Sequence, residues 1–298
     1  MIRQASACCL SLWLTLGLSS CVQTPDYLVS QQHQSPNHNQ RIRMVVLHYT
    51  TGDWGDSLRV LTEPSDHPVS AHYLIPERLD PSYPVDEVMK VYQLVGEQQR
   101  AWHAGDSRWE GKTSLNDQSI GIELVNRSQC YAGDDGFCLT PDFDPAQMEL
   151  LAKLLKDILR RHPEITATRV LGHSDIVPER KQDPGPRFPW QWLARQGIGA
   201  WFDDQTVLKY WQLLPEKPPI SLVQQGLQRY GYGIEITGEH DQQTKLYLMA
   251  FQRHFVPDQV HGNADRKTVA ILFALLEKYF PQSLKTKELQ LPAPANSN

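Results

Sequence analysis

The chain has 298 residues, enough for two domains, and its 40% hydrophobic content is ordinary for a globular protein. The formal net charge is −5, and acidic and basic residues are mixed along the chain instead of forming blocks. A nucleic-acid-binding protein normally carries a basic face, so this balance argues against nucleic-acid partners.

A short apolar run near the N-terminus has the form of an export signal. Arg3 places a positive charge before the apolar run 8–18, which is shorter than the roughly 20 apolar residues of a membrane-spanning helix. The run leads into LSSC (18–21), which resembles a bacterial lipobox. We therefore expect residues 1–20 to be a lipoprotein signal peptide and Cys21 to carry lipid, with a plain signal peptide as the alternative. Valine, not aspartate, follows Cys21, which by the same resemblance favours the outer membrane, facing the periplasm.

Two cysteines remain once the signal and Cys21 are set aside. Cys130 and Cys138 lie eight positions apart in a stretch rich in glycine and aspartate. In an oxidising compartment they are expected to close a small loop as a disulfide. A metal site is the alternative, but the spacing matches no common zinc knuckle.

The central part of the chain predicts a sheet covered by helices. A polar stretch, 21–40, is expected to be a flexible tether. Buried strands are predicted from apolar runs at 44–47, 69–75, 88–95, 120–125 and 170–171. Pro145–His162 predicts an amphipathic helix, which Asp144 and Gln147 would begin as a capping box. Its apolar face carries Met148, Leu151, Leu154, Leu155, Ile158 and Leu159. These patterns indicate an α/β fold with a mixed central sheet flanked by helices.

Prolines at 215, 218 and 219 predict a domain boundary. Beyond it, a Gly-Asp-Thr pattern at 238–244 recurs at 262–268, each time before an apolar helix, and another helix is expected at 222–230. Glycine permits a turn and aspartate can cap the helix that follows. We expect a catalytic domain at 41–214, a linker at 215–220, a small three-helix domain at 221–283 and a loose tail at 284–298.

Two histidines directly follow predicted buried strands. His48 and His173 occupy these positions, and Asp183 lies in a proline-flanked loop after His173. Two imidazoles and one carboxylate suit a catalytic zinc ion, because three protein ligands leave a fourth position open. Glu123 lies among apolar neighbours that would raise its pKa towards the range of a general base. Lys181 offers a positive charge that can stabilise an oxyanion.

The sequence is similar to the type-2 N-acetylmuramoyl-L-alanine amidases, a zinc amidase family whose fold is shared with phage T7 lysozyme and the peptidoglycan recognition proteins. The similar segments are VVLHYT (45–50), VSAHYLI (69–75), AWHAGDSRWEGKTSLNDQSIGIELVN (101–126) and GHSDIVPERKQDPGPRFPW (172–190). They occur in the order and spacing of the family.

The resemblance implies that His48, His173 and Asp183 bind one zinc ion per chain. It further implies that Glu123 is the catalytic acid/base and that Lys181 stabilises the transition state. The bond implied is the one between the lactyl group of N-acetylmuramic acid and L-alanine, in peptidoglycan or its muropeptide fragments.

The ends of the chain match the family's outer-membrane lipoprotein branch, because a lipobox and a C-terminal helical module accompany the amidase segments. The segment 221–280, with FQRHF (251–255), resembles the three-helix peptidoglycan-binding domain. This implies binding to the wall, with a spacer role as the alternative. The chain is expected to be a monomer.

Several residues are candidates for contact with substrate. Trp102 and His103 lie in the similar segment 101–126, and Tyr73 lies in the segment 69–75. His103 is alternatively a partner of the metal ligands or a structural loop residue. Asp175 is expected to cap the turn after His173.

Two other functions are compatible with these patterns. One is a catalytically inactive recognition protein, although the complete set of catalytic residues argues against it. The other is a zinc peptidase acting within the stem peptide, although the sequence lacks the His-Glu-x-x-His helix of the commonest zinc peptidases.

Overall fold

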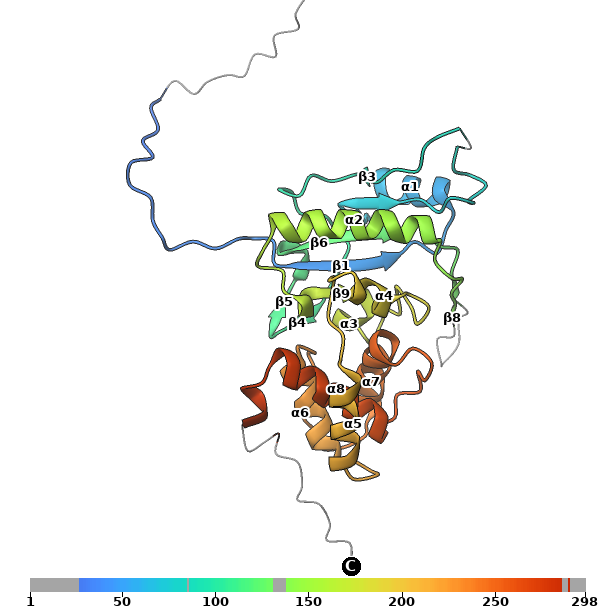
Figure 1. The fold of residues 1–298 in the computed structure, drawn as a ribbon. Coiled ribbons are helices and arrows are strands. Elements are labelled where there is room, and N and C mark those ends of the chain that lie inside the picture. The colour runs from blue at the N-terminus through green and yellow to red at the C-terminus, as the bar shows by residue number, and fades with distance from the viewer. Residues whose placement is uncertain (1–26, 85, 131–137, 286–288, 290–298) are drawn as a thin grey trace, which may run out of the picture. The chain divides into compact units, whose positions relative to one another are not determined.

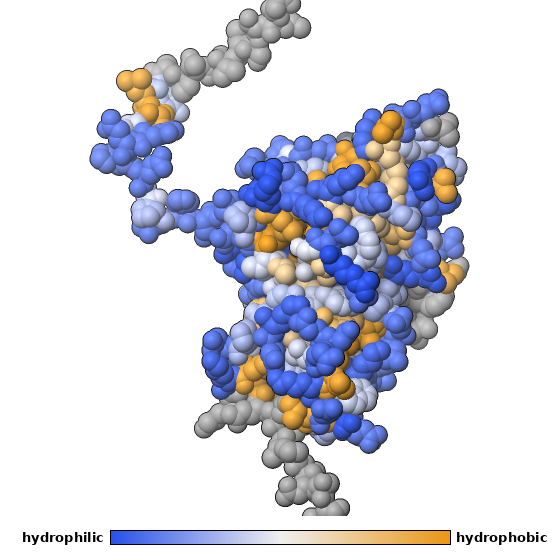
Figure 2. Space-filling model, viewed as in Figure 1, coloured by the Kyte–Doolittle hydropathy of each residue, from blue (hydrophilic) through white to orange (hydrophobic). Residues whose placement is uncertain are grey.

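The computed structural model describes residues 27–84, 86–130, 138–285 and 289. The predicted signal peptide and Cys21 therefore lie outside the described residues. The chain divides into residues 1–39 and a body formed by residues 40–298. Residues 27–39 are exposed and form no helix or strand (Figure 1). No helix within the described ranges has both the length and the apolar character needed to cross a membrane. Hydrophilic side chains cover most of the face of the molecule seen in Figure 2.

A five-stranded sheet lies at the centre of residues 40–203, the amidase-like part of the body, in the order β3-β2-β6-β1-β9 (Figure 1). Its strands are β1 (Met44–Tyr49), β2 (Tyr73–Ile75), β3 (Tyr92–Gln93), β6 (Ser119–Leu124) and β9 (Val170–Gly172). β6 and β9 run parallel to β1, β2 runs parallel to β6, and β3 is antiparallel to β2. The prediction of a mixed sheet is confirmed, although two of the predicted strands are shortened to β2 and β3.

The long helix α2 (Pro145–Arg161) lies across one face of the sheet (Figure 1). Successive side chains of a strand point to opposite faces. Accordingly Val45 and Leu47 pack in the core that contains α2, whereas Met44 and Val46 belong to the core on the other face. His48 continues the second series, which directs it away from α2. Of the predicted apolar face of α2, four residues are buried and two partly buried: Met148, Leu151, Leu155 and Ile158, then Leu154 and Leu159.

The start of α2 differs from its prediction in one respect. Asp144 caps the helix, since its Oδ1 accepts a hydrogen bond from the N–H of Ala146 at 2.9 Å. Gln147 does not complete the predicted capping box. Its Nε2 instead donates to the carbonyls of Ile75 and Val125, at 3.0 and 2.9 Å. Gln147 is fully buried against the strand ends, where these carbonyls need a donor.

Short elements complete the amidase-like part. The helices are α1 (Trp54–Thr62), α3 (His173–Ile176) and α4 (Trp190–Arg195), and the 3₁₀ turns are Leu115–Asp117 and Ala167–Arg169. Two hairpins are formed by β4 (Arg108–Trp109) with β5 (Lys112–Thr113), and by β7 (Gln129–Cys130) with β8 (Cys138–Leu139). The second hairpin pairs Cys130 with Cys138 in register. Residues 131–137 and both cysteine side chains lie outside the described part, so the disulfide stays a prediction.

Four helices form the C-terminal unit: α5 (Asp204–Leu213), α6 (Ile220–Tyr230), α7 (Gln242–Phe255) and α8 (Arg266–Tyr279), with a 3₁₀ turn at Ser283–Lys285. The predicted repeat is confirmed at the starts of α7 and α8. Gly238 and Gly262 have positive φ angles of 80° and 74°. Asp241 and Asp265 then each accept a hydrogen bond from the backbone N–H three residues later, at 2.8 and 3.0 Å.

The three expected helices are α6, α7 and α8, and α5 joins them from the segment before the predicted boundary. Although α5 precedes the predicted boundary, it packs along α8. Lys209 and Tyr210 of α5 both donate hydrogen bonds to Glu277 Oε2 of α8 at 2.6 Å.

The two parts of the body share one hydrophobic core. The cluster that holds Val46 and Trp109 from the amidase-like part also holds Tyr232, Phe251 and Leu272 from the C-terminal unit. One continuous hydrophobic core therefore packs the C-terminal unit against the amidase-like part.

Candidate active site

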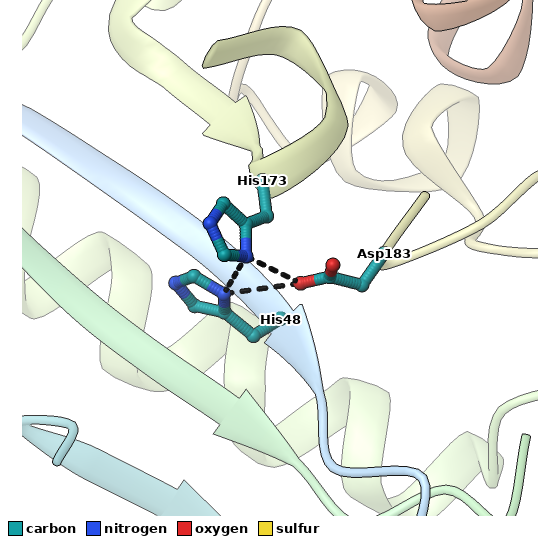
Figure 3. Close-up of side chains that lie close together, drawn as sticks. All are labelled: His48, His173 and Asp183. Atoms are coloured by element: carbon teal, nitrogen blue, oxygen red, sulfur yellow. Dashed lines mark hydrogen bonds and ion pairs between the residues drawn. The ribbon is translucent and has the colours of Figure 1, made fainter. Parts of the chain in front are cut away.

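Three side chains from separate segments converge at the ends of two parallel strands (Figure 3). Leu47 of β1 pairs with Gly172 of β9, which brings the next residues, His48 and His173, side by side. Their Nδ1 atoms lie 3.0 Å apart, and each lies 3.1 Å from Asp183 Oδ2. The N–H of Ser174 donates to the carbonyl of Asp183 at 2.9 Å, which holds the aspartate loop against the start of α3.

The donor set of this cluster fits a metal cation. His48, His173 and Asp183 are all buried. Burial, followed by the charge of His173, lowers the pKa of His48 to about 4, so its imidazole is neutral at pH 7. Burial alone would raise the pKa of Asp183, but its interactions with His173 and His48 outweigh this and hold the pKa below its usual range. Zinc is commonly bound by imidazole nitrogens and carboxylate oxygens, and here two imidazoles and one carboxylate face a common point.

His103 lies behind His48 and orients it. His48 Nε2 is 3.1 Å from His103 Nδ1, and His103 Nε2 is 3.2 Å from the hydroxyl of Ser119. That hydroxyl donates to the carbonyl of Leu115 at 2.6 Å. If the cluster-facing Nδ1 of His48 carries no proton, its Nε2–H donates to His103, and His103 in turn donates to Ser119. Such a chain fixes both ring orientation and tautomer, as is usual for metal-binding histidines.

Gly121 makes room for this arrangement. A Cβ atom at position 121 would lie 2.3 Å from Cγ of His103, closer than real contacts allow. The glycine in the Gly-Ile-Glu sequence was therefore a signal for a side chain packed across β6. The sequence analysis did not predict that His103 packs on Gly121, nor that Ser119 contacts His103.

Glu123 lies on β6 directly beside His48, because these two residues pair in the parallel register. Burial, followed by the negative charge of Asp183, raises the pKa of Glu123 to about 8, and Lys181 acts in the opposite direction. Its Oε2 atom has no hydrogen-bond partner among the described residues. A carboxyl with such a raised pKa can hold and release a proton near neutral pH.

These groups open onto one cleft of about 430 Å³. The cleft is lined by the three cluster residues together with Glu123, Lys181, Trp102 and His103, and α1 contributes Asp56, Ser57, Arg59 and Val60. Trp102 is 49% exposed, so part of it is accessible to a ligand in the cleft.

Tyr73 is not among the residues that line the cleft. Its hydroxyl instead donates to Glu97 at 2.6 Å, within an ion-pair group that includes Arg161 and His162. Tyr73 is therefore not among the proposed substrate contacts.

Comparison with known proteins agrees with this geometry. A family model described as N-acetylmuramoyl-L-alanine amidase matches residues 38–186, and one described as a peptidoglycan binding domain matches residues 216–272. The chain is 44% identical to N-acetylmuramoyl-L-alanine amidase AmiD of Escherichia coli (strain K12), over 88% of this chain and 92% of AmiD.

Two solved structures are similar over most of the fold. One is AmiD from E. coli in complex with the substrate anhydro-N-acetylmuramic acid-L-Ala-D-gamma-Glu-L-Lys, with a TM-score of 0.74, covering 85% of this chain and 96% of that one. The other is AmpDh3 from Pseudomonas aeruginosa in complex with anhydromuramic pentapeptide, 42% identical, with a TM-score of 0.78, covering 86% of this chain and 99% of that one. The chain therefore belongs to the N-acetylmuramoyl-L-alanine amidase family, and it is an amidase that uses one zinc ion.

Proposed function

We propose that this amidase hydrolyses the bond between the lactyl carbonyl of N-acetylmuramic acid and the L-alanine of the stem peptide, in peptidoglycan or its muropeptide fragments. The observation that carries the proposal is the convergence of His48, His173 and Asp183 in a cleft that Glu123 also lines. The muramoyl peptides bound to AmiD and AmpDh3 support this class of substrate.

His48, His173 and Asp183 are the proposed zinc ligands. Zinc bound there would polarise the carbonyl and lower the pKa of water. This choice rests on the donor set and on the hydrogen bond that orients His48 from behind.

Glu123 is the proposed acid/base. It takes a proton from the attacking water as the water oxygen bonds to the lactyl carbon. As the C–N bond breaks, Glu123 returns that proton to the amine of L-alanine. Its raised pKa supports both steps, because the carboxyl can gain and lose a proton near neutral pH.

Lys181 is proposed to stabilise the negative charge that develops on the carbonyl oxygen. It lines the same cleft as Glu123, and its ammonium is a compact positive charge. Trp102 is proposed to contact the substrate through the part of it that is exposed.

The cellular setting is proposed from the N-terminal sequence. The apolar run and LSSC (18–21) support export and lipid attachment at Cys21, which would anchor a monomer to the outer membrane on its periplasmic side. The C-terminal unit is proposed to bind the wall, which the match of residues 216–272 supports. A Cys21→Ser variant should leave the membrane fraction and keep its activity in solution.

Digestion of purified muropeptides tests the proposed reaction. The wild type and Glu123→Gln should each bind one zinc ion, and the wild type alone should release an intact stem peptide beginning with L-alanine. A chelator should abolish that release. Binding without cleavage would indicate a recognition protein, and cuts inside the stem peptide would indicate a peptidase; either result overturns the proposal.

A further inference from the structure

A buried carboxylate joins the C-terminal unit to the segment that carries His173. Asp175 is 1% exposed and lies in α3, two residues after His173. Its Oδ2 accepts a hydrogen bond from the backbone N–H of Gly172 at 2.8 Å, which is the expected cap of the turn. The same carboxylate has two further partners, and both belong to the C-terminal unit.

These partners are Tyr232 and His254. The hydroxyl of Tyr232 donates to Asp175 Oδ1 at 2.7 Å, and His254 Nδ1 lies 2.8 Å from Asp175 Oδ2. A buried carboxylate needs such partners, because leaving its oxygens unsatisfied is costly. Both oxygens of Asp175 therefore have partners: Gly172 from the amidase-like part, and Tyr232 and His254 from the C-terminal unit.

Both partners are held rigidly in turn. Tyr232 is 1% exposed and packs edge-to-face on Trp109, with ring centroids 4.9 Å apart. His254 stacks on Trp190 at 3.7 Å, with an interplanar angle of 16°. Trp109 and Trp190 belong to the amidase-like part, so the contact is fixed on both sides.

His173 depends on its backbone more than His48 does. A ligating histidine is normally oriented by a bond to its second ring nitrogen, as His48 is by His103. For His173, the second nitrogen, Nε2, has no hydrogen-bond partner among the described residues. The position of its ring therefore follows from the backbone at Gly172 and from the turn that Asp175 caps.

The backbone at Gly172 also abuts the loop of the third cluster residue. A Cβ atom at position 172 would lie 2.7 Å from Cδ of Pro184, the residue after Asp183. A shift of Gly172 would thus change the position of His173 relative to Asp183 as well as to His48.

We propose that Tyr232 and His254 are positioning residues of the zinc site. They hold the carboxylate of Asp175, and Asp175 holds the backbone from which His173 reaches the metal. The C-terminal unit then has a second role besides contact with the wall, because it completes the support of a metal ligand. This inference rests on the proposed role of His173 as a zinc ligand.

The test compares two Tyr→Phe substitutions in the full chain. Tyr232→Phe removes the hydroxyl that reaches Asp175. Tyr210→Phe is the matched control, because it removes a hydroxyl that donates to a carboxylate within the C-terminal unit, at 2.6 Å from Glu277. Zinc dissociation constants are measured by competition with a chelator. The geometry of the site is read from the visible spectrum of the Co²⁺-substituted proteins, and circular dichroism checks that each variant is folded.

Tyr232→Phe is expected to weaken zinc binding about tenfold, the lower end of the effect of removing outer partners of metal ligands, and to shift the Co²⁺ spectrum. Tyr210→Phe should match the wild type in both. A folded Tyr232→Phe with wild-type zinc affinity and spectrum overturns the inference, as does an equal effect of Tyr210→Phe.

A His173→Ala variant separates this inference from the proposed function. If His173→Ala loses zinc while Tyr232→Phe does not, the inference alone fails. If His173→Ala keeps wild-type affinity, the proposed ligand set itself is wrong.

Combining Tyr232→Phe with Asp175→Asn identifies the route of the effect. If Tyr232 acts through Asp175, the loss of zinc affinity in the double variant is smaller than the product of the two single losses. A loss equal to that product would contradict action through Asp175.

Discussion

Replacing Glu123 by glutamine should stabilise the metal-free protein by an amount that depends on pH. The raised pKa of about 8 means that the folded protein keeps the carboxyl proton at pH values where the unfolded chain, with its ordinary value of 4.5, has lost it. Below about pH 4.5 the group is protonated in both states and costs nothing. As the pH rises from there to about 8, the folded state binds more protons than the unfolded one, so the free energy of unfolding falls.

The size of this effect follows from the gap between the two pKa values. From 4.5 to about 8, at about 1.4 kcal/mol per pKa unit, the limit is roughly 5 kcal/mol. Because Glu123 is only partly buried and opens onto the cleft, we expect about 2–3 kcal/mol at pH 8. Glutamine has nearly the same shape and does not titrate, so it avoids this cost.

Urea unfolding of both proteins in the presence of a chelator, at several values between pH 5 and 8, measures the difference. The excess stability of Glu123→Gln should be small at pH 5 and grow steadily towards pH 8. With zinc bound the difference should shrink, because a nearby cation favours the ionised carboxylate. A difference that stays constant with pH, or a wild type that is the more stable protein at pH 8, would refute the reasoning.

Three other substitutions test separate parts of the site. Gly121→Ala should lower the free energy of unfolding by about 1–3 kcal/mol and weaken zinc binding, because its Cβ would collide with His103; unchanged thermal unfolding would contradict this packing. His103→Ala should weaken zinc binding about 10- to 100-fold, measured by chelator competition, since it removes the partner that orients His48; wild-type affinity would exclude that role. Lys181→Met should reduce kcat about 100-fold or more with little change in KM, measured by steady-state kinetics, whereas a change confined to KM would assign Lys181 to substrate binding.

The main elements around the site could be predicted from the sequence because each has a strong local pattern. The apolar runs that became β1 and β9 are buried on both faces, and the residues that follow them are His48 and His173. Parallel strands end at the same edge of a sheet, so their proximity followed from the pattern. The repeat in the C-terminal unit was equally local, since glycine turns and aspartate caps act over a few residues.

Contacts between distant segments could not be predicted in this way. The position of the His103 side chain, facing either a ligand or His48, depends on how its loop packs across β6. In the sequence this packing is indicated by Gly121, since any larger residue there would collide with His103. Gln147 fitted a capping box by spacing, but the buried carbonyls of two strand ends competed for its amide. The attachment of Tyr232 and His254 to Asp175 arises from packing between two parts of the chain that the sequence presents as separate.

Hydrolysis in water enriched in ¹⁸O, followed by mass spectrometry of the products, tests the proposed reaction most directly. With zinc-loaded wild-type protein and an intact muropeptide, we expect one labelled oxygen in the lactyl carboxyl of the sugar product and an unlabelled stem peptide with a free L-alanine amine. A label in a carboxyl of the peptide, with the sugar still joined to L-alanine, would contradict the assignment of the bond and of the site.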